Sequence, residues 1–194
     1  MKVAIVGGTG SFGRAVAARL HAAGDDVVLG SRDRARAAEA AAELGVEGAA
    51  NEEAVGGVAL VVLSTKAEAA IETARGLPFE SPLLCVASEL RSDELRSIAE
   101  RVADVVDVPV LAGLHSLAAR KLGGSLPDED AFVCGDDADA KLLGLELAQK
   151  LVAGRAVDAG PLRSARALEA LTGVLVGINR RYKAHAGLRV TGLS

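Results

Sequence analysis

The chain has 194 residues, which is enough for one well-buried domain and too few for two large ones. Half of its residues are hydrophobic, only 2% are aromatic, and the formal net charge is −4. This composition excludes a base-stacking platform and gives no sign of a phosphate-backbone binder, so we expect no nucleic-acid partner. No apolar run approaches the roughly 18 residues that suggest a membrane span, so we expect no membrane association.

The two cysteines, Cys85 and Cys134, lie in separate apolar runs without the spacing of a redox motif. Buried free thiols are the simplest interpretation, and they fit a reducing compartment. The start of the chain lacks the layout of a signal peptide. We therefore expect a cytoplasmic protein.

The first predicted element is a buried strand over Lys2–Val6, which is followed by glycines at the G-x-G-x-x-G spacing and by a helix-like segment. This order is the dinucleotide-binding fingerprint, in which glycines permit a tight turn, a close approach to a pyrophosphate and close helix packing. Backbone N–H groups at the helix start then face the phosphates. The predicted cofactor loop consists of Gly8, Thr9, Gly10, Ser11, Phe12 and Gly13.

The second predicted strand, residues 26–30, ends at Ser31 and Arg32, where a dinucleotide fold reads the adenosine ribose. A site specific for NAD places a carboxylate there, whereas a hydroxyl and a guanidinium bind a 2′-phosphate. We therefore predict that the cofactor is NADP and that Ser31 and Arg32 hold it. Arg34 and Arg36 are interpreted as the solvated start of the following helix.

Beyond this point strands and helices alternate, which predicts right-handed βαβ units and a mostly parallel sheet in a single domain, 1–194. The further strands are expected over 58–63, 82–87, 108–112, 131–134 and 155–158. The helices are expected over 33–44, 51–55, 68–76, 92–104, 138–152 and 164–183. Within them, Asn51 and Ser92 are proposed N-caps, and the apolar faces are Leu95, Ile98 and Val102, and then Leu168, Leu171, Leu175 and Ile178.

Polar side chains also follow two of these strands at the sheet edge where ligands collect in open α/β folds. Ser64, Thr65 and Lys66 follow residues 58–63, and Lys66 either reaches cofactor phosphate or ribose or is solvated. His115 lies in the turn after residues 108–112, and both a functional and a structural role stay open for it. We find no zinc-site spacing and no nucleophile elbow, so we expect no metal.

The motifs GGTGSFG, GSR, LHSLAAR, VCGDD, DAGPLRSAR and ALTG occur in this order through nearly the whole chain. In this combination the chain resembles the NADPH-dependent coenzyme F420 reductases, also called F420H2:NADP oxidoreductases. The resemblance implies a Rossmann-like α/β domain that is closed by a small C-terminal helical portion, about 155–194, and a homodimer. It also implies direct hydride transfer between nicotinamide C4 of NADP and deazaflavin C5 of coenzyme F420, with no catalytic side chain.

The resemblance assigns individual residues as well. Thr9, Gly10, Ser31 and Arg32 match the NADP site, the turn of His115, Ser116 and Leu117 matches residues that flank the deazaflavin, and Arg166 and Thr172 match the F420 side of the pocket. The chain departs from the family pattern at Lys66 and Ala67, where a proline and an aromatic residue are typical, and at Ala170, where a serine is common.

Two other functions stay open from the residues alone. An NADP-dependent reductase of an imine or small carbonyl needs a proton donor, and His115 is the obvious candidate. A non-catalytic NADP sensor would bind NADPH without oxidising it, and the unusual Lys66 and Ala67 leave room for that function.

Overall fold

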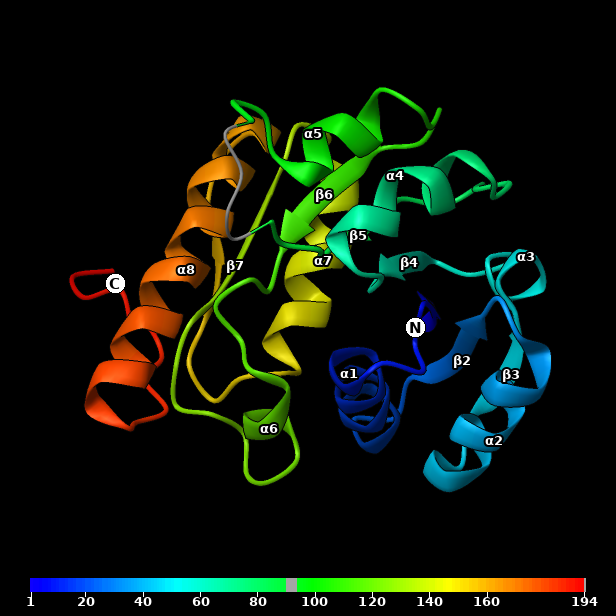
Figure 1. Cartoon of the computed structure of the whole chain (residues 1–194), viewed down its shortest axis with the longest axis horizontal. Helices are drawn as coiled ribbons and strands as arrows, with labels where there is room; N and C mark the ends of the chain where they lie inside the picture. The colour runs from blue at the N-terminus through cyan, green and yellow to red at the C-terminus, as the bar shows by residue number, and fades with distance from the viewer. Residues whose placement is uncertain (90–93, 194) are drawn as a thin grey trace.

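Eight strands form one sheet with helices on both faces (Figure 1). The computed structural model describes residues 1–89 and 94–193. The strands are β1 Lys2–Val6, β2 Asp26–Ser31, β3 Glu47–Ala50, β4 Leu60–Leu63, β5 Leu83–Cys85, β6 Val110–Gly113, β7 Ala131–Gly135 and β8 Ala156–Asp158. The helices are α1 Ser11–Ala22, α2 Arg34–Leu44, α3 Asn51–Ala54, α4 Ala67–Arg75, α5 Ile98–Ala103, α6 Ala119–Leu122, α7 Ala138–Gln149 and α8 Ala165–Tyr182, with a 3-10 turn over Leu162–Ser164.

The strand order is β3-β2-β1-β4-β5-β6-β7-β8. All neighbours pair in parallel except β6 and β7, which pair antiparallel. The prediction of a mostly parallel, Rossmann-like α/β fold is therefore confirmed. Strand β3 was not predicted, because its residues, EGAA, contain no branched apolar run. The strand order reverses between β1 and β4, which makes the carboxyl ends of these two strands the topological switch point.

Alternate residues of each strand face opposite layers of the molecule, as the two-residue period of a strand requires. Val3 and Ile5 of β1 pack with α1, α2 and α7 on one face of the sheet. Ala4 and Val6 pack with α3, α4, α5 and the start of α8 on the other face. Burial on both faces explains why the central strands read as continuous apolar runs.

The helix expected over 92–104 is shorter than predicted. Ser92 lies outside the described residues, and α5 begins at Ile98, where Ser97 and Glu100 form a capping box. Leu95 is 91% exposed, so its assignment to the apolar face was wrong, whereas Ile98 and Val102 are buried as predicted.

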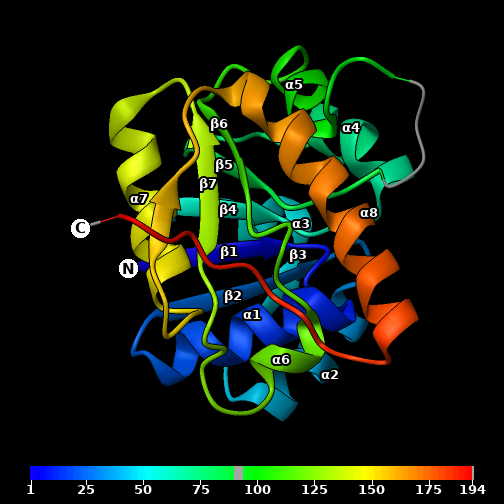
Figure 2. The same cartoon turned by 90° about the vertical axis from the view of Figure 1, so that its left-hand side faces the viewer.

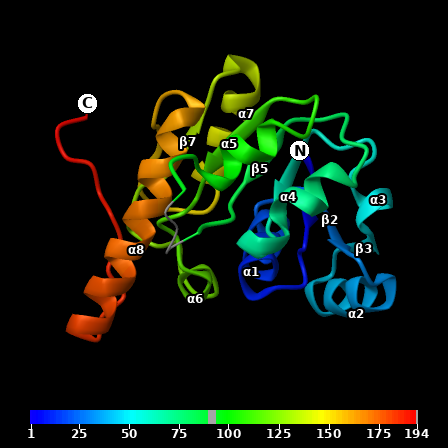
Figure 3. The ribbon, with the colours of Figure 1, turned by 45° about the horizontal axis from the view of Figure 1, so that its top comes forward.

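The final helix was predicted with four core positions, and the last of them is wrong. Leu175 is buried, and Leu168 and Leu171 are partly buried. Ile178 is 38% exposed, because the C-terminal part of α8 extends beyond the sheet that covers its beginning (Figure 3).

The segment after α8 returns to the sheet and is bonded to the start of β7 (Figure 2). The Asp130 N–H donates to the Leu188 carbonyl at 2.7 Å, and the Val190 N–H donates to Asp130 Oδ2 at 2.8 Å. Backbone N–H groups of Val190 and Arg155, together with the Arg155 guanidinium, lower the pKa of Asp130 to about 2. These bonds hold the end of the chain beside β7.

Both cysteines are buried and free, as predicted. Burial raises the pKa of each thiol to about 12, which makes them unreactive. Among the described helices, none has the length and apolar character needed to traverse a bilayer.

Candidate functional site

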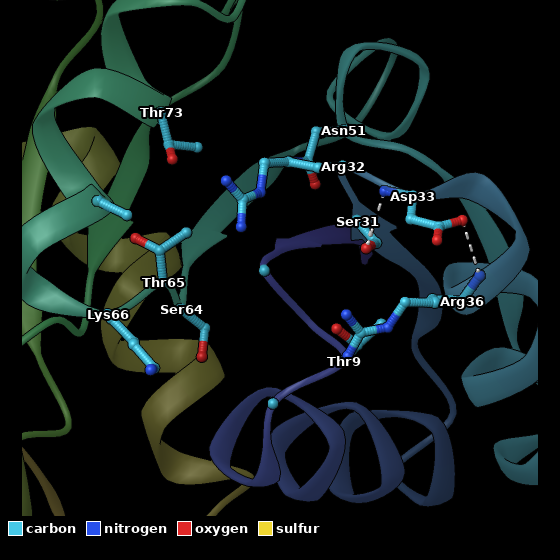
Figure 4. Close-up of a pocket in the computed structure, with 13 residues that line it drawn as sticks. Thr9, Ser31, Arg32, Asp33, Arg36, Asn51, Ser64, Thr65, Lys66 and Thr73 are labelled. Atoms are coloured by element: carbon cyan, nitrogen blue, oxygen red, sulfur yellow. Dashed lines mark hydrogen bonds between the residues drawn. The ribbon is translucent and has the colours of Figure 1, made fainter.

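The carboxyl ends of β1, β2 and β4 surround a pocket of about 420 Å³, which we call the switch-point pocket (Figure 4). At its base Gly7 has φ +71°, and a Cβ there would lie 2.9 Å from Thr65 Cγ2 and 3.1 Å from the Ser64 carbonyl oxygen. Only glycine therefore fits between the two loops. The lining residues are Gly7, Thr9, Gly10, Ser31, Arg32, Asp33, Arg36, Asn51, Ser64, Thr65, Lys66, Ala69 and Thr73.

The predicted glycine loop divides into residues that line this pocket and residues that pack behind it. Thr9 and Gly10 line the pocket. Gly8 and Gly13 face each other, and a Cβ on Gly13 would lie 2.7 Å from the Gly8 Cα, so this pair allows α1 to approach β1 closely. Phe12 packs against the core, and Ser11 faces a different cavity, described below.

Two arginines extend from the end of β2 and the first turn of α2 into the switch-point pocket (Figure 4). Arg32 was predicted here, whereas Arg36 was interpreted as solvated. Arg36 is indeed exposed, but it stands on the pocket wall. Among the described residues, no ion pair or hydrogen bond engages either guanidinium. Two free guanidinium groups at one wall are the arrangement that binds a phosphate.

The carboxylate of Asp33 also lines this pocket, but it is hydrogen-bonded to the start of α2. Asp33 Oδ1 accepts hydrogen bonds from the Ala35 N–H at 2.9 Å and the Arg36 N–H at 3.3 Å, and so caps α2. The Asp33 N–H in turn donates to Ser31 Oγ at 3.2 Å. Because the helix N-terminus engages its negative charge, Asp33 opposes a phosphate less than a free carboxylate would.

Two further polar groups of the pocket lack partners. Asn51 Oδ1 and Thr65 Oγ1 are buried without a hydrogen-bond partner among the described residues. Buried polar atoms are normally bonded, so these two favour a polar ligand in the pocket. The sequence analysis assigned Asn51 as an N-cap, which was wrong: Ala50 occupies that position, and the Asn51 side chain faces the pocket.

A second cavity, of about 690 Å³, lies between α4, the loop after β5 and α8; we call it the acidic cavity. Ala67 lines it while Lys66 lines the switch-point pocket, so the two spaces adjoin. Glu89 forms an ion pair with Arg101 at 2.6 Å. The lining residues are Ala67, Glu68, Ser88, Glu89, Gly173, Val176, Gly177 and Arg180.

A third cavity, of about 650 Å³, lies between the start of α1, the start of α6 and α8; we call it the arginine cavity. Val176 borders both this cavity and the acidic one, so α8 walls both. The lining residues are Ser11, Ala118, Ala119, Arg120, Val176 and Asn179.

The predicted substrate turn after β6 lies behind these cavities and is strained. Leu114 has φ +63°, a conformation that costs a non-glycine residue about 1–2 kcal/mol. His115 and Leu117 are each only 7% exposed. The two ring nitrogens of His115 and the Ser116 hydroxyl are buried. None of them has a hydrogen-bond partner of normal geometry among the described residues. The strain and the unpaired polar groups together favour a binding role.

Burial lowers the pKa of His115 to about 4, although the nearby Ala87 backbone opposes this shift. The imidazole is therefore neutral near pH 7. The Thr172 hydroxyl donates to the His115 carbonyl at 2.8 Å, which ties the turn to α8 next to Gly173 of the acidic cavity. His115, Ser116, Leu117, Arg166 and Thr172 do not themselves line any of the three cavities.

Helix α8 is also held against α5. Glu169, 1% exposed, accepts the Ile98 N–H on Oε1 at 2.8 Å. Burial raises the pKa of Glu169 to about 7, against the opposing effect of the Ile98 bond. Arg166 Nε donates to the Glu94 carbonyl at 3.1 Å. The C-terminal motif residues thus position the helix that walls two cavities.

The chain is similar to proteins of known family. Residues 2–86 match the family described as NADP oxidoreductase, coenzyme F420-dependent. Two curated relatives share the description F420-dependent NADP reductase. The protein from Methanothermobacter thermautotrophicus is 33% identical, and the alignment covers 100% of this chain and 96% of the relative. The protein from Methanocaldococcus jannaschii is 31% identical, with 100% and 99% covered.

A solved structure from Arthrobacter sp. FB24, provisionally described as an F420-dependent NADP reductase, superposes with a TM-score of 0.85. It is 24% identical and covers 99% of this chain and 100% of the solved one, so it supports the fold. A 1-pyrroline-5-carboxylate reductase from Streptococcus pyogenes gives a TM-score of 0.73 at 18% identity, but this chain covers only 66% of it. The full length of the fold is therefore shared with the first structure.

Proposed function

Because the chain belongs to the family of F420-dependent NADP reductases, we propose that it transfers a hydride between NADP(H) and coenzyme F420. The observation that carries the proposal is that the switch-point pocket and the acidic cavity lie side by side. Lys66 lines the first, which has two free guanidinium groups, and Ala67 lines the second, against α8. One space suits a dinucleotide and the other a second planar substrate. When both are bound, the nicotinamide and the deazaflavin carry the reacting carbons themselves.

On the NADP side, the residues of this chain supply charge and close approach. Arg32 and Arg36, with the Ser31 hydroxyl, bind the 2′-phosphate. Gly10 precedes α1, whose first N–H groups and whose positive dipole end stabilise the pyrophosphate. Ser64, Thr65 and Lys66 bind along the same edge, and Thr65 Oγ1 is the buried group that needs a partner. Gly8, Phe12 and Gly13 contribute by packing.

On the F420 side, we propose that the portion from about 155 to 194 completes the substrate pocket of a single domain. Thr172 holds the turn of His115, Ser116 and Leu117 against α8, and Arg166 fixes the helix start. In this pocket the chain excludes water and orients the two rings. The barrier to hydride transfer falls because the reacting carbons are already in position.

The state of His115 separates this proposal from an imine or carbonyl reductase. Such an enzyme needs a group that gives up a proton near neutral pH. A histidine whose pKa is about 4 is already neutral at that pH and is a poor proton donor. Direct hydride transfer between two cofactors needs no such donor, so the buried neutral imidazole is compatible with it.

We also propose a cytoplasmic homodimer. Val174, Ile178 and Tyr182 are exposed at four-residue spacing on one face of α8, where a second copy would bury them. Free buried thiols fit a reducing compartment. Light scattering on the purified chain should give twice the mass of one chain, and an Ile178→Asp variant should shift it to the monomer.

The test of the function is a spectrophotometric assay on purified protein with NADPH and oxidised F420. We expect loss of the F420 absorbance band together with oxidation of NADPH, and a much slower reaction with NADH. A sensor would bind NADPH and leave both spectra unchanged, and that result would remove the catalytic proposal.

A further inference from the structure

The arginine cavity contains a cation that the rest of the chain leaves unpaired. Most described arginines engage a carboxylate or a carbonyl: Arg14 pairs with Glu43, Arg101 with Glu89 and Arg155 with Asp130. Arg32 and Arg36 do not, and they line the pocket that we assign to a phosphate. Arg120 shares this property. Within residues 1–89 and 94–193 no ion pair or hydrogen bond engages its guanidinium.

The two cavities that α8 walls differ in charge. Glu68 and Glu89 line the acidic cavity together with Arg180. The arginine cavity is lined by no carboxylate, and its charged member is Arg120. Asn179 adds a polar group at the same wall: its Oδ1 accepts the Ala186 N–H at 2.6 Å, which leaves its NH₂ group as the available donor. An anion therefore meets two donors and no carboxylate at the arginine cavity, whereas at the acidic cavity it meets the carboxylates of Glu68 and Glu89 beside Arg180.

This asymmetry bears on a substrate with an apolar ring at one end and anionic groups at the other. F420 is such a molecule, since its deazaflavin ring carries a side chain with a phosphodiester and glutamate carboxylates. Val176 borders both cavities, so a ring that meets the nicotinamide near Ala67 has an exit along α8 into either one.

We propose that the arginine cavity, which no carboxylate lines, binds the anionic side chain of F420, with Arg120 and Asn179 as its donors. This proposal rests on the proposed function, and it goes beyond it by naming the residues that distinguish F420 from a bare deazaflavin. Arg120 is a specificity-determining residue here, not a catalytic one.

The experiment compares F420 with the deazaflavin that retains the ribityl chain and lacks the phosphate and glutamates. Losing one charge-assisted contact costs about 1.5–3 kcal/mol, so Arg120→Ala should raise KM for F420 about 10- to 100-fold. KM for the shortened deazaflavin, KM for NADPH and kcat should each stay within about twofold. Asn179→Asp keeps the acceptor for Ala186 but adds a carboxylate, and it should raise KM for F420 alone.

Arg163→Ala is the matched control, because Arg163 is an exposed arginine that lines neither α8 cavity and has no side-chain partner among the described residues. This variant should leave kcat and the KM values for F420, the shortened deazaflavin and NADPH unchanged. Equal losses for both deazaflavins in Arg120→Ala would place this residue at the ring and overturn the proposal, as would no change for F420.

A binding titration with oxidised F420 in the absence of NADP separates this proposal from the proposed function. The wild-type chain should bind F420 more tightly than the shortened deazaflavin, and this difference should vanish in Arg120→Ala and shrink as salt is added. If the difference is present but no hydride is transferred, the proposed function fails and the assignment of the cavity stands. If wild-type chain binds both deazaflavins equally, the assignment of the cavity fails, whether or not hydride is transferred.

Discussion

The switch-point pocket and the α8 cavities are built in opposite ways. Apart from Ser31 of β2, Arg36 of α2, Asn51 of α3 and two residues of α4, the pocket is formed by loops that directly follow β1, β2 and β4, all within the first 73 residues. The α8 cavities draw on α1, α4, α6, the loop after β5 and α8, which are widely separated along the chain. The first site is a property of short segments, whereas the second exists only once α8 is placed.

The two sites also use different interactions. The switch-point pocket offers two guanidinium groups, hydroxyls and two unpaired buried oxygens, Asn51 Oδ1 and Thr65 Oγ1, which suit phosphates and ribose. The α8 cavities offer alanine, glycine and valine walls together with charged side chains, which suit a ring with a charged side chain. Changes to the first site should therefore be read in cofactor affinity, and changes to the second in substrate affinity and in the anchoring of α8.

The largest effect is expected from removing both guanidinium groups of the first site. Each lost charge-assisted bond costs about 1.5–3 kcal/mol, so Arg32→Ala with Arg36→Ala should weaken NADPH binding by about 3–6 kcal/mol, roughly 10²- to 10⁴-fold. NADH lacks the 2′-phosphate, and its affinity should change by less than about threefold. Isothermal titration with both nucleotides measures this difference.

Arg34→Ala serves as the control for this pair. Arg34 forms an exposed ion pair with Glu53 at 2.7 Å, and such pairs contribute less than about 1 kcal/mol. It should not change either affinity. If the double variant loses NADPH and NADH equally, these arginines do not read the 2′-phosphate.

A smaller effect is expected at the buried carboxyl that anchors α8. The pKa of Glu169 in the folded chain is about 7, above its ordinary value of 4.5. Between these pH values the folded state retains a proton that the unfolded state releases, so the free energy of unfolding falls as pH rises through this window. The contribution is complete below about pH 4.5 and is lost, up to about 3 kcal/mol, by about pH 7.

The measurement is chemical denaturation at pH 5 and pH 8. Glu169→Gln keeps an acceptor for the Ile98 N–H and has no charge. Its free energy of unfolding, relative to that of the wild-type chain, should therefore rise by up to about 3 kcal/mol from pH 5 to pH 8. Glu39→Gln, at an exposed position of α2, should parallel the wild-type chain. Parallel curves for Glu169→Gln would contradict a raised pKa at this carboxyl.

The sequence predicts the switch-point pocket better than the α8 cavities. The strands Lys2–Val6 and Leu60–Leu63 and the residues after them were recognised because a parallel strand buried on both faces leaves a continuous apolar run that ends in polar residues. Ser31 and Arg32 were recognised from their place at a strand end. Arg36 was not, because an arginine in the first turn of a helix looks the same whether it faces solvent or a pocket.

The α8 side gave a weaker local signal. The family motifs identified His115 and Thr172, and the structure shows the bond between them, but no pattern indicated that Ser11 faces Arg120 across a cavity. Leucine rarely adopts a positive φ, so the strained Leu114 had no signature either. Ile178 has the helical spacing of a core residue, and only the position of the sheet edge decides that it is exposed.

The smallest effect concerns Gly8 and Gly13, whose close approach allows α1 to pack on β1. A Cβ on Gly13 would lie 2.7 Å from the Gly8 Cα and 2.9 Å from its carbonyl oxygen, which are backbone atoms that cannot rotate away. Gly13→Ala should therefore lower the free energy of unfolding by about 1–3 kcal/mol, the usual cost of overpacking. Because the contact is internal, this loss should be present without any nucleotide, as thermal denaturation of the free chain would show.

Gly124→Ala is the matched control, since nothing lies within 4 Å of a Cβ there and its φ is not positive. It should leave the free energy of unfolding within about 0.5 kcal/mol of wild-type. If Gly13→Ala unfolds like the wild-type chain but loses NADPH affinity, then Gly13 acts at the cofactor after all. The boundary between packing and binding residues in the glycine loop would then move from Gly10 to Gly13.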